Sequence, residues 1–472
     1  MKFKKFGKAL LMSALSAGVV LSVTSCVQSY TTGFLYVTGT VTADPTGNGI
    51  ITGYKIDHNT GRLRPINGLP ISSGGANPIR AFLLSGQRFL YVLNQGISDN
   101  PAGSSICTTD YPCKNSNITQ FAVGGNGILT AQETFYTQGV NPFRIVGDSA
   151  GKYIYVLDHD SPDPSSTSSN PVVATSNANC SAALTGATTC GDITAFQVDA
   201  TTGRLTLVVN TQVTVANCGT TSTSCPLTYF PVPVDPIDFV LSSQTFLTLS
   251  GTPATGDSVF PYSYSQTSGQ LTVNQNNSQP LNIHQATAIN TAAGYIWVLD
   301  NEPITYTPTD STTAVTAYSQ ILQFSVGTNG ALQAQTGGAV PDDFSNTLAN
   351  PIALMAETPK GSWVYVANVG NNTTSTGLTT TGIAGYILDS SSHQLTAMPG
   401  QPFGVGSGPQ CIVEDPSNQF IYEGNFNDST VTGQSIEQNS GILVPLSQST
   451  RAPSKYELTG PATWCLVDAR TS

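Results

Sequence analysis

The sequence predicts an all-β protein, a seven-bladed β-propeller built from four-stranded antiparallel blades. Three observations support this prediction: a turn phrase that recurs along the chain, seven copies of one strand pattern, and a composition of 45 Gly, 29 Pro and only 10% charged residues in 472. Such a composition is typical of many short strands joined by turns. Several short sheets could also form a sandwich, but seven copies in phase favour the propeller.

The turn phrase marks the repeating unit. It reads DHNTGRL at 57–63 and DATTGRL at 199–205, and it returns as SQTSGQL at 265–271, GTNGAL at 327–332 and EQNSGIL at 437–443. A recurring turn implies a recurring supersecondary unit.

The second strand of each unit has a common aromatic and aliphatic pattern. The seven copies are FLYV at 34–37, FLYVLN at 89–94, YIYVLD at 153–158, FLTLSG at 246–251, YIWVLD at 295–300, WVYVAN at 363–368 and FIYEGN at 420–425. A third strand follows each, with an aromatic residue at its fourth place in every copy except the last, which has Gln434. A large ring at a fixed place of an alternating strand suits a sheet packed between two others.

The first strands predict how the ring closes. They begin near residues 77, 141, 235, 284, 350, 408 and 460. The seventh follows the last complete unit, whereas none precedes the strand at 34–37. The C-terminal strand should therefore complete the first blade, and the propeller should span 34–472.

The N-terminus is predicted to direct export. Four lysines within residues 1–8 precede an apolar run at 9–23 and the phrase VTSC ending at Cys26. This pattern resembles a bacterial lipoprotein signal at 1–25, with Cys26 as the lipidated residue and 26–33 as a tether. Ordinary cleavage nearby, with Cys26 incidental, is the alternative. Val27 provides no acidic retention signal, so we expect an envelope protein on the outer membrane or facing the periplasm.

Charge and cysteines restrict the class further. Without the leader, 13 basic residues stand against 28 acidic ones, and a net charge of −15 disfavours a nucleic-acid partner. Eight cysteines remain after Cys26, without zinc-site spacing. In a compartment that permits disulfides, the expected pairs are Cys107 with Cys113, Cys180 with Cys190, Cys218 with Cys225 and, by elimination, Cys411 with Cys465.

Long insertions are predicted to gather on one face. The connections from second to third strand, and from fourth strand to the next blade, share one end of a propeller blade. The insertions of both kinds are 95–117, 158–192, 206–234, 301–320, 333–349 and 369–382. We expect this looped face to be the binding face, although drift in solvent-exposed loops gives the same pattern.

The repeat resembles a known family, the seven-bladed lactonases, which includes 6-phosphogluconolactonase-like and muconate cycloisomerase-like proteins with YVTN-type repeats. The phrases that carry the resemblance are NPIRAFLLSGQRFLYVLN from 77, GDITAFQVDATTGRL from 191 and NPIALMAETPKGSWVYVAN from 350. It extends over 34–470. It implies the fold and a lactonase-type activity, but the same unit occurs in non-enzymatic surface propellers.

Enzymatic members of that family place arginine, histidine and an acidic residue at the channel mouth. No such Arg-His pair can be placed in this chain. Arg80 and Arg144, with Asp238 at the matching place of the fourth blade, could still form a polar site that binds a carboxylate or phosphate. His284 or Glu302 would act as the base that activates water. Arg and Asp at equivalent places of neighbouring blades could instead pair with each other.

Other candidates are weaker. The phrase DHDSPD brings Asp158, Asp160 and Asp163 together for a hard cation, but it lacks the glycine and terminal glutamate of a calcium loop, so Asx turns are the competing interpretation. His58 and His393 lie in turns of the opposite face, where exposure is expected. No phosphate loop or GxSxG motif occurs, so no cofactor is predicted.

Two functions follow from these features. One is a lipid-anchored, extracytoplasmic hydrolase that opens a sugar-acid or related lactone. The other is a non-enzymatic envelope propeller that binds a glycan or a protein on its looped face. In both, the lipid anchor is the expected contact with the membrane.

Overall fold

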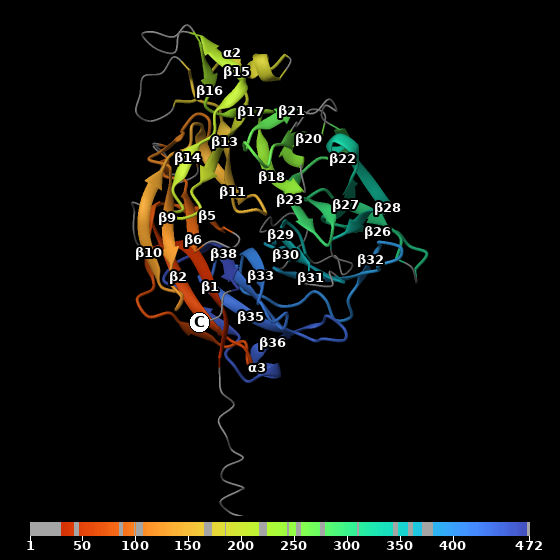
Figure 1. Cartoon of the computed structure of the whole chain (residues 1–472). Helices are drawn as coiled ribbons and strands as arrows, with labels where there is room; N and C mark the ends of the chain where they lie inside the picture. The colour runs from red at the N-terminus through yellow and green to blue at the C-terminus, as the bar shows by residue number, and fades with distance from the viewer. Residues whose placement is uncertain are drawn as a thin grey trace, which may run out of the picture.

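The protein is a propeller with its blades arranged around a central axis, as Figure 1 shows. The computed structural model describes residues 30–469 apart from 42–46, 85–87, 99, 101–106, 165–171, 185, 217–223, 243–244, 252–255, 274–278, 309–310, 343–347, 357–361 and 371–380. Over these residues, seven antiparallel sheets of four or five strands form the blades. The predicted fold class is confirmed. The leader and Cys26 lie outside the described residues.

Each blade has four strands in order from the axis outward. The innermost strands are β5 (Pro78–Leu83), β11 (Val140–Gly147), β18 (Pro236–Ser242), β23 (Ala286–Ala292), β29 (Pro351–Ala356), β33 (Pro409–Glu414) and β38 (Ala462–Asp468). The second strands are β1 (Thr31–Thr40), β6 (Phe89–Asn94), β12 (Tyr153–Asp160), β19 (Thr245–Ser250), β24 (Tyr295–Asp300), β30 (Trp363–Asn368) and β34 (Phe420–Asn425). The blades are numbered 1 to 7 by these second strands.

The outer strands complete each blade. The third strands are β2 (Asn48–Asp57), β9 (Asn117–Val123), β13 (Gly191–Val198), β20 (Asp257–Tyr264), β27 (Gln320–Val326), β31 (Gly382–Leu388) and β35 (Thr430–Ile436). The fourth are β3 (Leu63–Pro65), β10 (Leu129–Phe135), β14 (Leu205–Leu207), β21 (Leu271–Val273), β28 (Leu332–Pro341), β32 (Leu395–Ala397) and β36 (Leu443–Pro445). Four blades add a short strand that pairs with the third: β4 (Ile71–Ala76), β17 (Phe230–Val232), β22 (Gln279–Ile283) and β37 (Lys455–Glu457).

The hydrophobic core lies between blades, because alternate side chains of a strand face opposite neighbours. In β6, Leu90 and Val92 pack with residues of blade 1. Tyr91 and Leu93, on the other side of the same strand, pack with residues of blade 3. Each such fully buried side chain stabilises the fold by roughly 1.5–3 kcal/mol. This two-sided burial explains the continuous apolar pattern of the second strands.

The recurring turn phrase connects the third and fourth strands of a blade and also contacts the preceding blade. Its glycine adopts a positive φ, for example 69° at Gly203, which favours glycine. The Gly203 carbonyl accepts a hydrogen bond of 2.6 Å from Tyr91 Oη of the preceding blade. Equivalent bonds run from Tyr36, Tyr155, Tyr365 and Tyr422 to Gly127, Gly269, Gly441 and Gly61. The glycine of DATTGRL therefore provides both the turn and a contact between blades.

The C-terminal strand closes the ring as predicted. β38 pairs antiparallel with β1, with Cys465 opposite Val37. The predicted disulfide between Cys411 and Cys465 is present, with 5.7 Å between the Cα atoms, and it joins β33 to β38. β1 starts at Thr31, within the stretch assigned to the tether, because Thr31 already pairs with Asp57.

Blade 7 carries a polar pair where its neighbours are apolar. Glu423 replaces the valine of the second strand, and Gln434 replaces the aromatic residue of the third. Both are fully buried, and Gln434 Nε2 donates to Glu423 Oε1 at 2.9 Å. Burial raises the pKa of Glu423 to about 8, which the bond from Gln434 only partly opposes. The carboxyl group is therefore largely protonated at neutral pH.

Glu423 should make the stability of the protein fall as pH rises. The unfolded carboxyl group titrates near 4.5 and the folded one near 8, so the folded state holds an extra proton between these values. Relative to the wild type, we expect Glu423→Gln to gain about 4 kcal/mol of free energy of unfolding between pH 5 and pH 8.5. Denaturant unfolding at both pH values measures this. The exposed Glu437→Gln is the control, and parallel pH profiles for Glu423→Gln and the wild type would contradict the prediction.

The insertions carry the remaining elements. These are the pairs β7 (Ile97–Ser98) with β8 (Cys113–Lys114), β15 (Asn210–Ala216) with β16 (Ser224–Leu227) and β25 (Ile304–Tyr306) with β26 (Val315–Ala317), and the short helices α2 (Ala178–Ala183), η1 (Thr328–Gly330) and α3 (Leu446–Ser449). Two predicted local disulfides are present, Cys107 with Cys113 and Cys180 with Cys190. Cys218 of the third lies outside the described residues. In the described part of the chain, no helix is long and apolar enough to cross a membrane.

Candidate functional site

The innermost strands bring seven side chains to one level around the axis. Each strand has a bulge near its start. The residue beyond the bulge pairs with the fifth residue of the second strand in six blades, and with Thr38 of β1 in blade 1. These equivalent residues are Arg80, Arg144, Asp238, Ala288, Ala353, Cys411 and Trp464. We call them the channel layer. Three of the five predicted site residues belong to it.

Arg144 and Asp238 form an ion pair within the channel layer. Arg144 Nε donates to Asp238 Oδ1 at 2.9 Å, across the junction of blades 3 and 4. The other carboxylate oxygen of Asp238 accepts the backbone N–H of Ile289 at 3.2 Å. Arg144 Nη1 donates to the carbonyl of Phe143. The pairing of Arg with Asp that the sequence left open is therefore observed, and it commits much of the hydrogen-bonding capacity of both groups.

Arg80 has a different environment. Its guanidinium lies over the ring of Trp464 at 3.7 Å from the centroid, a cation–π contact between blades 2 and 1. It makes no hydrogen bond or ion pair with the described residues. Burial and then the charge of Arg144 lower the pKa of Arg80, and Asp238 opposes them. The guanidinium remains charged near neutral pH because its ordinary pKa is so high. Arg80 thus offers unpaired N–H donors to an anion.

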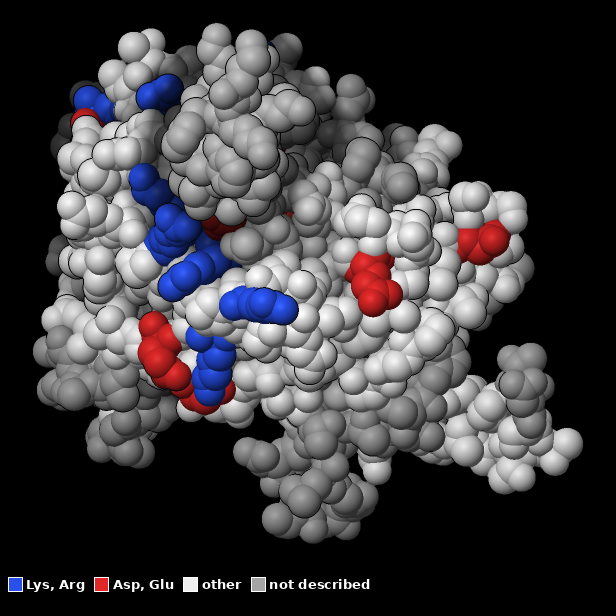
Figure 2. All heavy atoms as spheres, turned by 90° about the horizontal axis from the view of Figure 1, so that it is seen from below, with Lys and Arg blue, Asp and Glu red and all other residues white. Residues whose placement is uncertain are grey.

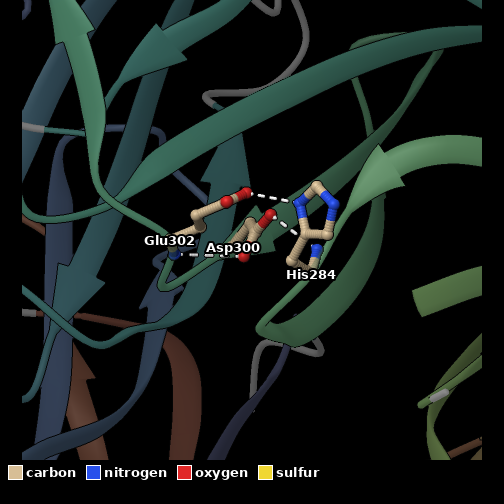
Figure 3. Close-up of side chains that lie close together, drawn as sticks. All are labelled: His284, Asp300 and Glu302. Carbon is tan, nitrogen blue, oxygen red and sulfur yellow. Dashed lines mark hydrogen bonds and ion pairs between the residues drawn. The ribbon is translucent and has the colours of Figure 1, made fainter. Parts of the chain in front are cut away.

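His284 and Glu302 meet at the start of blade 5. His284 precedes β23, and Glu302 lies two residues beyond the end of β24, so the antiparallel pairing of these strands brings the side chains together. The His284 Nδ1 to Glu302 Oε2 distance is 2.6 Å, and both side chains are partly exposed. Figure 3 shows the pair with Asp300 beside it. This predicted pair exists as a contact.

Asp300 fixes the backbone on both sides of the His284–Glu302 pair. Its carboxylate accepts backbone N–H groups of His284, Gln285 and Glu302 at 2.9–3.2 Å, and the Gln320 amide donates to both Asp300 and Glu302. Burial raises the pKa of Asp300, and these hydrogen bonds oppose it. Sequence reasoning missed Asp300, although its position two residues before Glu302, at a strand end, was a usable signal.

The arrangement suits activation of water. Nδ1 of His284 faces a carboxylate, which favours a proton on Nδ1 and leaves Nε2 as the acceptor. No hydrogen bond reaches Nε2 from the described residues, and 43% of the side chain is exposed. An exposed imidazole oriented by a carboxylate is the arrangement that a general base requires.

The same three side chains could hold a cation. One ligand atom from each of His284, Asp300 and Glu302 lies within 4.8 Å of the others. One nitrogen and two oxygens provide three ligands, so water or substrate would complete the coordination. The oxygens of Asp300 already accept several N–H groups, which weakens their donation to a metal.

The candidate cation site at DHDSPD is not formed. Asp158 is fully buried and lies opposite Asp192 of β13 in the strand pairing. Burial raises the pKa of Asp158 to about 7, and burial together with the charge of Asp158 raises that of Asp192. Asp160 binds Thr109, Asn141 and His159 instead. Two buried carboxyl groups side by side disfavour the ionisation of both, which is consistent with the raised pKa of each.

A cleft between blades 3 and 4 contains His159, the histidine of the phrase DHDSPD. The cavity has a volume of about 270 Å³ and is lined in part by Thr109, His159, Asp160 and Asp235. His159 Nδ1 lies 3.1 Å from Asp160, and Nε2 lies 4.0 Å from Asp235. The hydrogen bond to Asp160 raises the pKa of His159, against the effect of burial. This imidazole is engaged at both nitrogens, unlike that of His284.

The predicted site residues form two groups. Arg80, Arg144 and Asp238 belong to the channel layer, and His284 with Glu302 lies at the edge of blade 5 where β23 begins and β24 ends. Within the described residues, no hydrogen bond or ion pair joins the two groups. His58 and His393 are only partly exposed: His58 stacks on Tyr30, and His393 hydrogen-bonds Tyr295.

Comparison with known proteins gives the fold. No family model and no curated protein matches the chain. A candidate 6-phosphogluconolactonase from Bacteroides fragilis has a TM-score of 0.57 at 12% identity, covering 92% of this chain and 98% of that one. The Pseudomonas aeruginosa periplasmic gluconolactonase has a TM-score of 0.54 at 16% identity, covering 92% of this chain and 99% of that one. A Lactobacillus plantarum protein has a TM-score of 0.55 at 16% identity, covering 93% of this chain and 99% of that one. The chain therefore shares the seven-bladed propeller fold of these three proteins.

Proposed function

We propose that the protein is an extracytoplasmic, lipid-anchored lactonase that hydrolyses a lactone bearing an anionic group. The contact of 2.6 Å between His284 and Glu302 carries this proposal, because it leaves an oriented, solvent-accessible imidazole nitrogen. His284 Nε2 would take a proton from water as the water oxygen attacks the lactone carbonyl. The ring oxygen would leave as a hydroxyl group by taking that proton back from the imidazolium, and the product would be the open acid.

Export is supported by the cysteines and by the leader. Disulfides persist in oxidising compartments and are rare in the cytosol, and three pairs that the sequence singled out are present. The leader resembles a lipoprotein signal ending at Cys26. The solved gluconolactonase from Pseudomonas aeruginosa is itself described as periplasmic. An extracytoplasmic lactonase is consistent with all three observations.

The direct test is lactone hydrolysis by the purified mature chain. A panel should contain neutral sugar lactones and lactones that carry a carboxylate or phosphate, with acid release followed in a pH-stat. Each assay is repeated after dialysis against a chelator. Turnover that survives the chelator supports the histidine–glutamate pair as the base, and turnover that is lost and restored by a divalent ion supports the metal arrangement. No turnover above background on any lactone would contradict the proposal.

Arg80 should determine the preference for anionic lactones. Its guanidinium has no partner but Trp464, so removing it breaks no ion pair within the described chain. We expect Arg80→Gln to raise KM for an anionic lactone about 10- to 100-fold with kcat nearly unchanged, since a charge-assisted contact contributes about 1.5–3 kcal/mol. KM for a neutral lactone should not change. Steady-state kinetics on both substrates measures this, with the exposed Arg88→Gln as the control. An equal rise on both lactones would contradict the role of Arg80.

A further inference from the structure

A basic hollow lies where blade 1 meets blade 7. The turn of blade 1 at 57–63 packs against the segment after α3, and Thr450 Oγ1 donates to the Thr60 carbonyl at 2.7 Å. The cavity between them has a volume of about 290 Å³, and its lining includes Arg62, Arg64 and Arg451. We call these three residues the arginine edge. All three side chains are exposed.

The charge of this edge contrasts with the rest of the molecule. Figure 2 shows lysine and arginine side chains gathered on one part of the surface seen from below, on a protein with far more acidic than basic residues. The one carboxylate that lines the hollow belongs to Asp57, which is 5% exposed. Asp57 Oδ1 accepts the N–H groups of Asn59 and Thr60, and Oδ2 lies 3.4 Å from Arg64. Arg62 and Arg451 have no ion pair among the described residues.

The described chain begins beside the arginine edge. Tyr30 stacks on His58 at 4.3 Å between ring centroids, and its carbonyl accepts the His58 N–H at 3.0 Å. His58 belongs to the same turn as Arg62. Cys26 precedes Tyr30 by four residues, and four residues span at most about 14 Å. A lipid on Cys26 would therefore hold this edge close to the bilayer surface.

We propose that the arginine edge docks on anionic phospholipid headgroups and orients the propeller on its membrane. This inference rests on the proposed lipid anchor at Cys26 but not on lactone hydrolysis. Arginine forks match phosphate oxygens, and basic residues beside a lipid anchor add to its membrane affinity. The turn at 57–63 joins third to fourth strand, so it lies at the opposite end of the blades from His284 and Glu302. Docking here would direct the candidate site away from the membrane.

The test uses the mature chain with Cys26→Ser, so that binding without the lipid is measured. Vesicles of phosphatidylcholine alone, or with an equal part of phosphatidylglycerol, are sedimented with the protein. We expect binding only to the anionic vesicles, lost as NaCl is raised. Arg62→Gln and Arg451→Gln should each weaken it about fivefold, since one basic residue at an anionic surface contributes about 1 kcal/mol.

Arg204→Gln is the matched control, because Arg204 holds the place of Arg62 in the same turn phrase of blade 3 and is likewise exposed. Equal loss with Arg204→Gln, or equal binding to neutral vesicles, would overturn the docking proposal. Fatty-acid labelling of the chain with and without Cys26 tests the anchor separately. Labelled protein without a vesicle preference would contradict docking alone, and absence of turnover on lactones would bear only on the enzymatic proposal.

Discussion

The His284→Ala variant should lose lactone hydrolysis by about 10²- to 10⁴-fold in kcat, the usual contribution of a general base. Its KM should change little, because the imidazole would act on water rather than on the lactone. The side chain is 43% exposed and its removal leaves no large cavity, so the fold should be retained. The kcat of Glu302→Gln should lie between those of His284→Ala and the wild type, since the amide keeps a hydrogen bond to His284 but loses the negative charge.

The measurement is kcat for both variants on the best lactone of the panel, with circular dichroism as the check of fold. Added imidazole should restore part of the activity of His284→Ala, a rescue that a purely structural role would not allow. His159→Ala is the informative comparison, because His159 also lies beside a carboxylate but in the cleft between blades 3 and 4. Loss in His159→Ala with full activity in His284→Ala would move the reaction to that cleft.

Replacing Cys411 and Cys465 together by serine should lower the free energy of unfolding by about 4 kcal/mol. The two residues are 54 positions apart, and a cross-link that closes a loop of this length restricts the unfolded chain by about that amount. The bond also ties β33 to β38 beside the junction where β38 completes blade 1. Denaturant unfolding of the double variant, compared with the wild type in oxidising buffer, measures the loss.

Replacing Cys107 and Cys113 by serine is the matched comparison. These residues are six positions apart in an insertion, so the shorter loop predicts a smaller loss of about 2 kcal/mol. The loss of stability in the Cys411 and Cys465 double variant should also disappear when this variant and the wild type are both fully reduced. A loss from Cys411 and Cys465 no greater than that from the local pair would show that the ring gains little from this bond.

The fold was predictable because its signals are local and repeated. Seven copies of an apolar second strand, six of them with a glycine in the later turn of the same blade, can be counted without knowing which sheets touch. The displaced C-terminal strand and the pairing of Cys411 with Cys465 followed from that count. The bond from Tyr91 to Gly203 could not be foreseen, but it gives the physical reason why the glycine returns.

The site was predictable only in part, because it depends on contacts across blades. Arg80 meets Trp464 through the register of β38 on β1, in which a bulge shifts Trp464 to the level of the arginine. A one-residue shift in register is invisible in a single sequence. Likewise, the pairing of β12 with β13 places Asp158 opposite Asp192. The aspartate of the DHDSPD phrase therefore belongs to a buried pair of carboxyl groups and not to a cation site.

The pairing of β38 with β1 has a consequence for biosynthesis. The remaining six blades each come from one contiguous stretch, but blade 1 needs strands from both ends of the chain. The first strands to leave the ribosome are therefore the last to be completed, and until residues 462–468 arrive, β1 presents an open edge on which foreign strands can add. A truncation that removes residues 462–468 should thus be far more harmful, through aggregation, than the loss of one strand suggests.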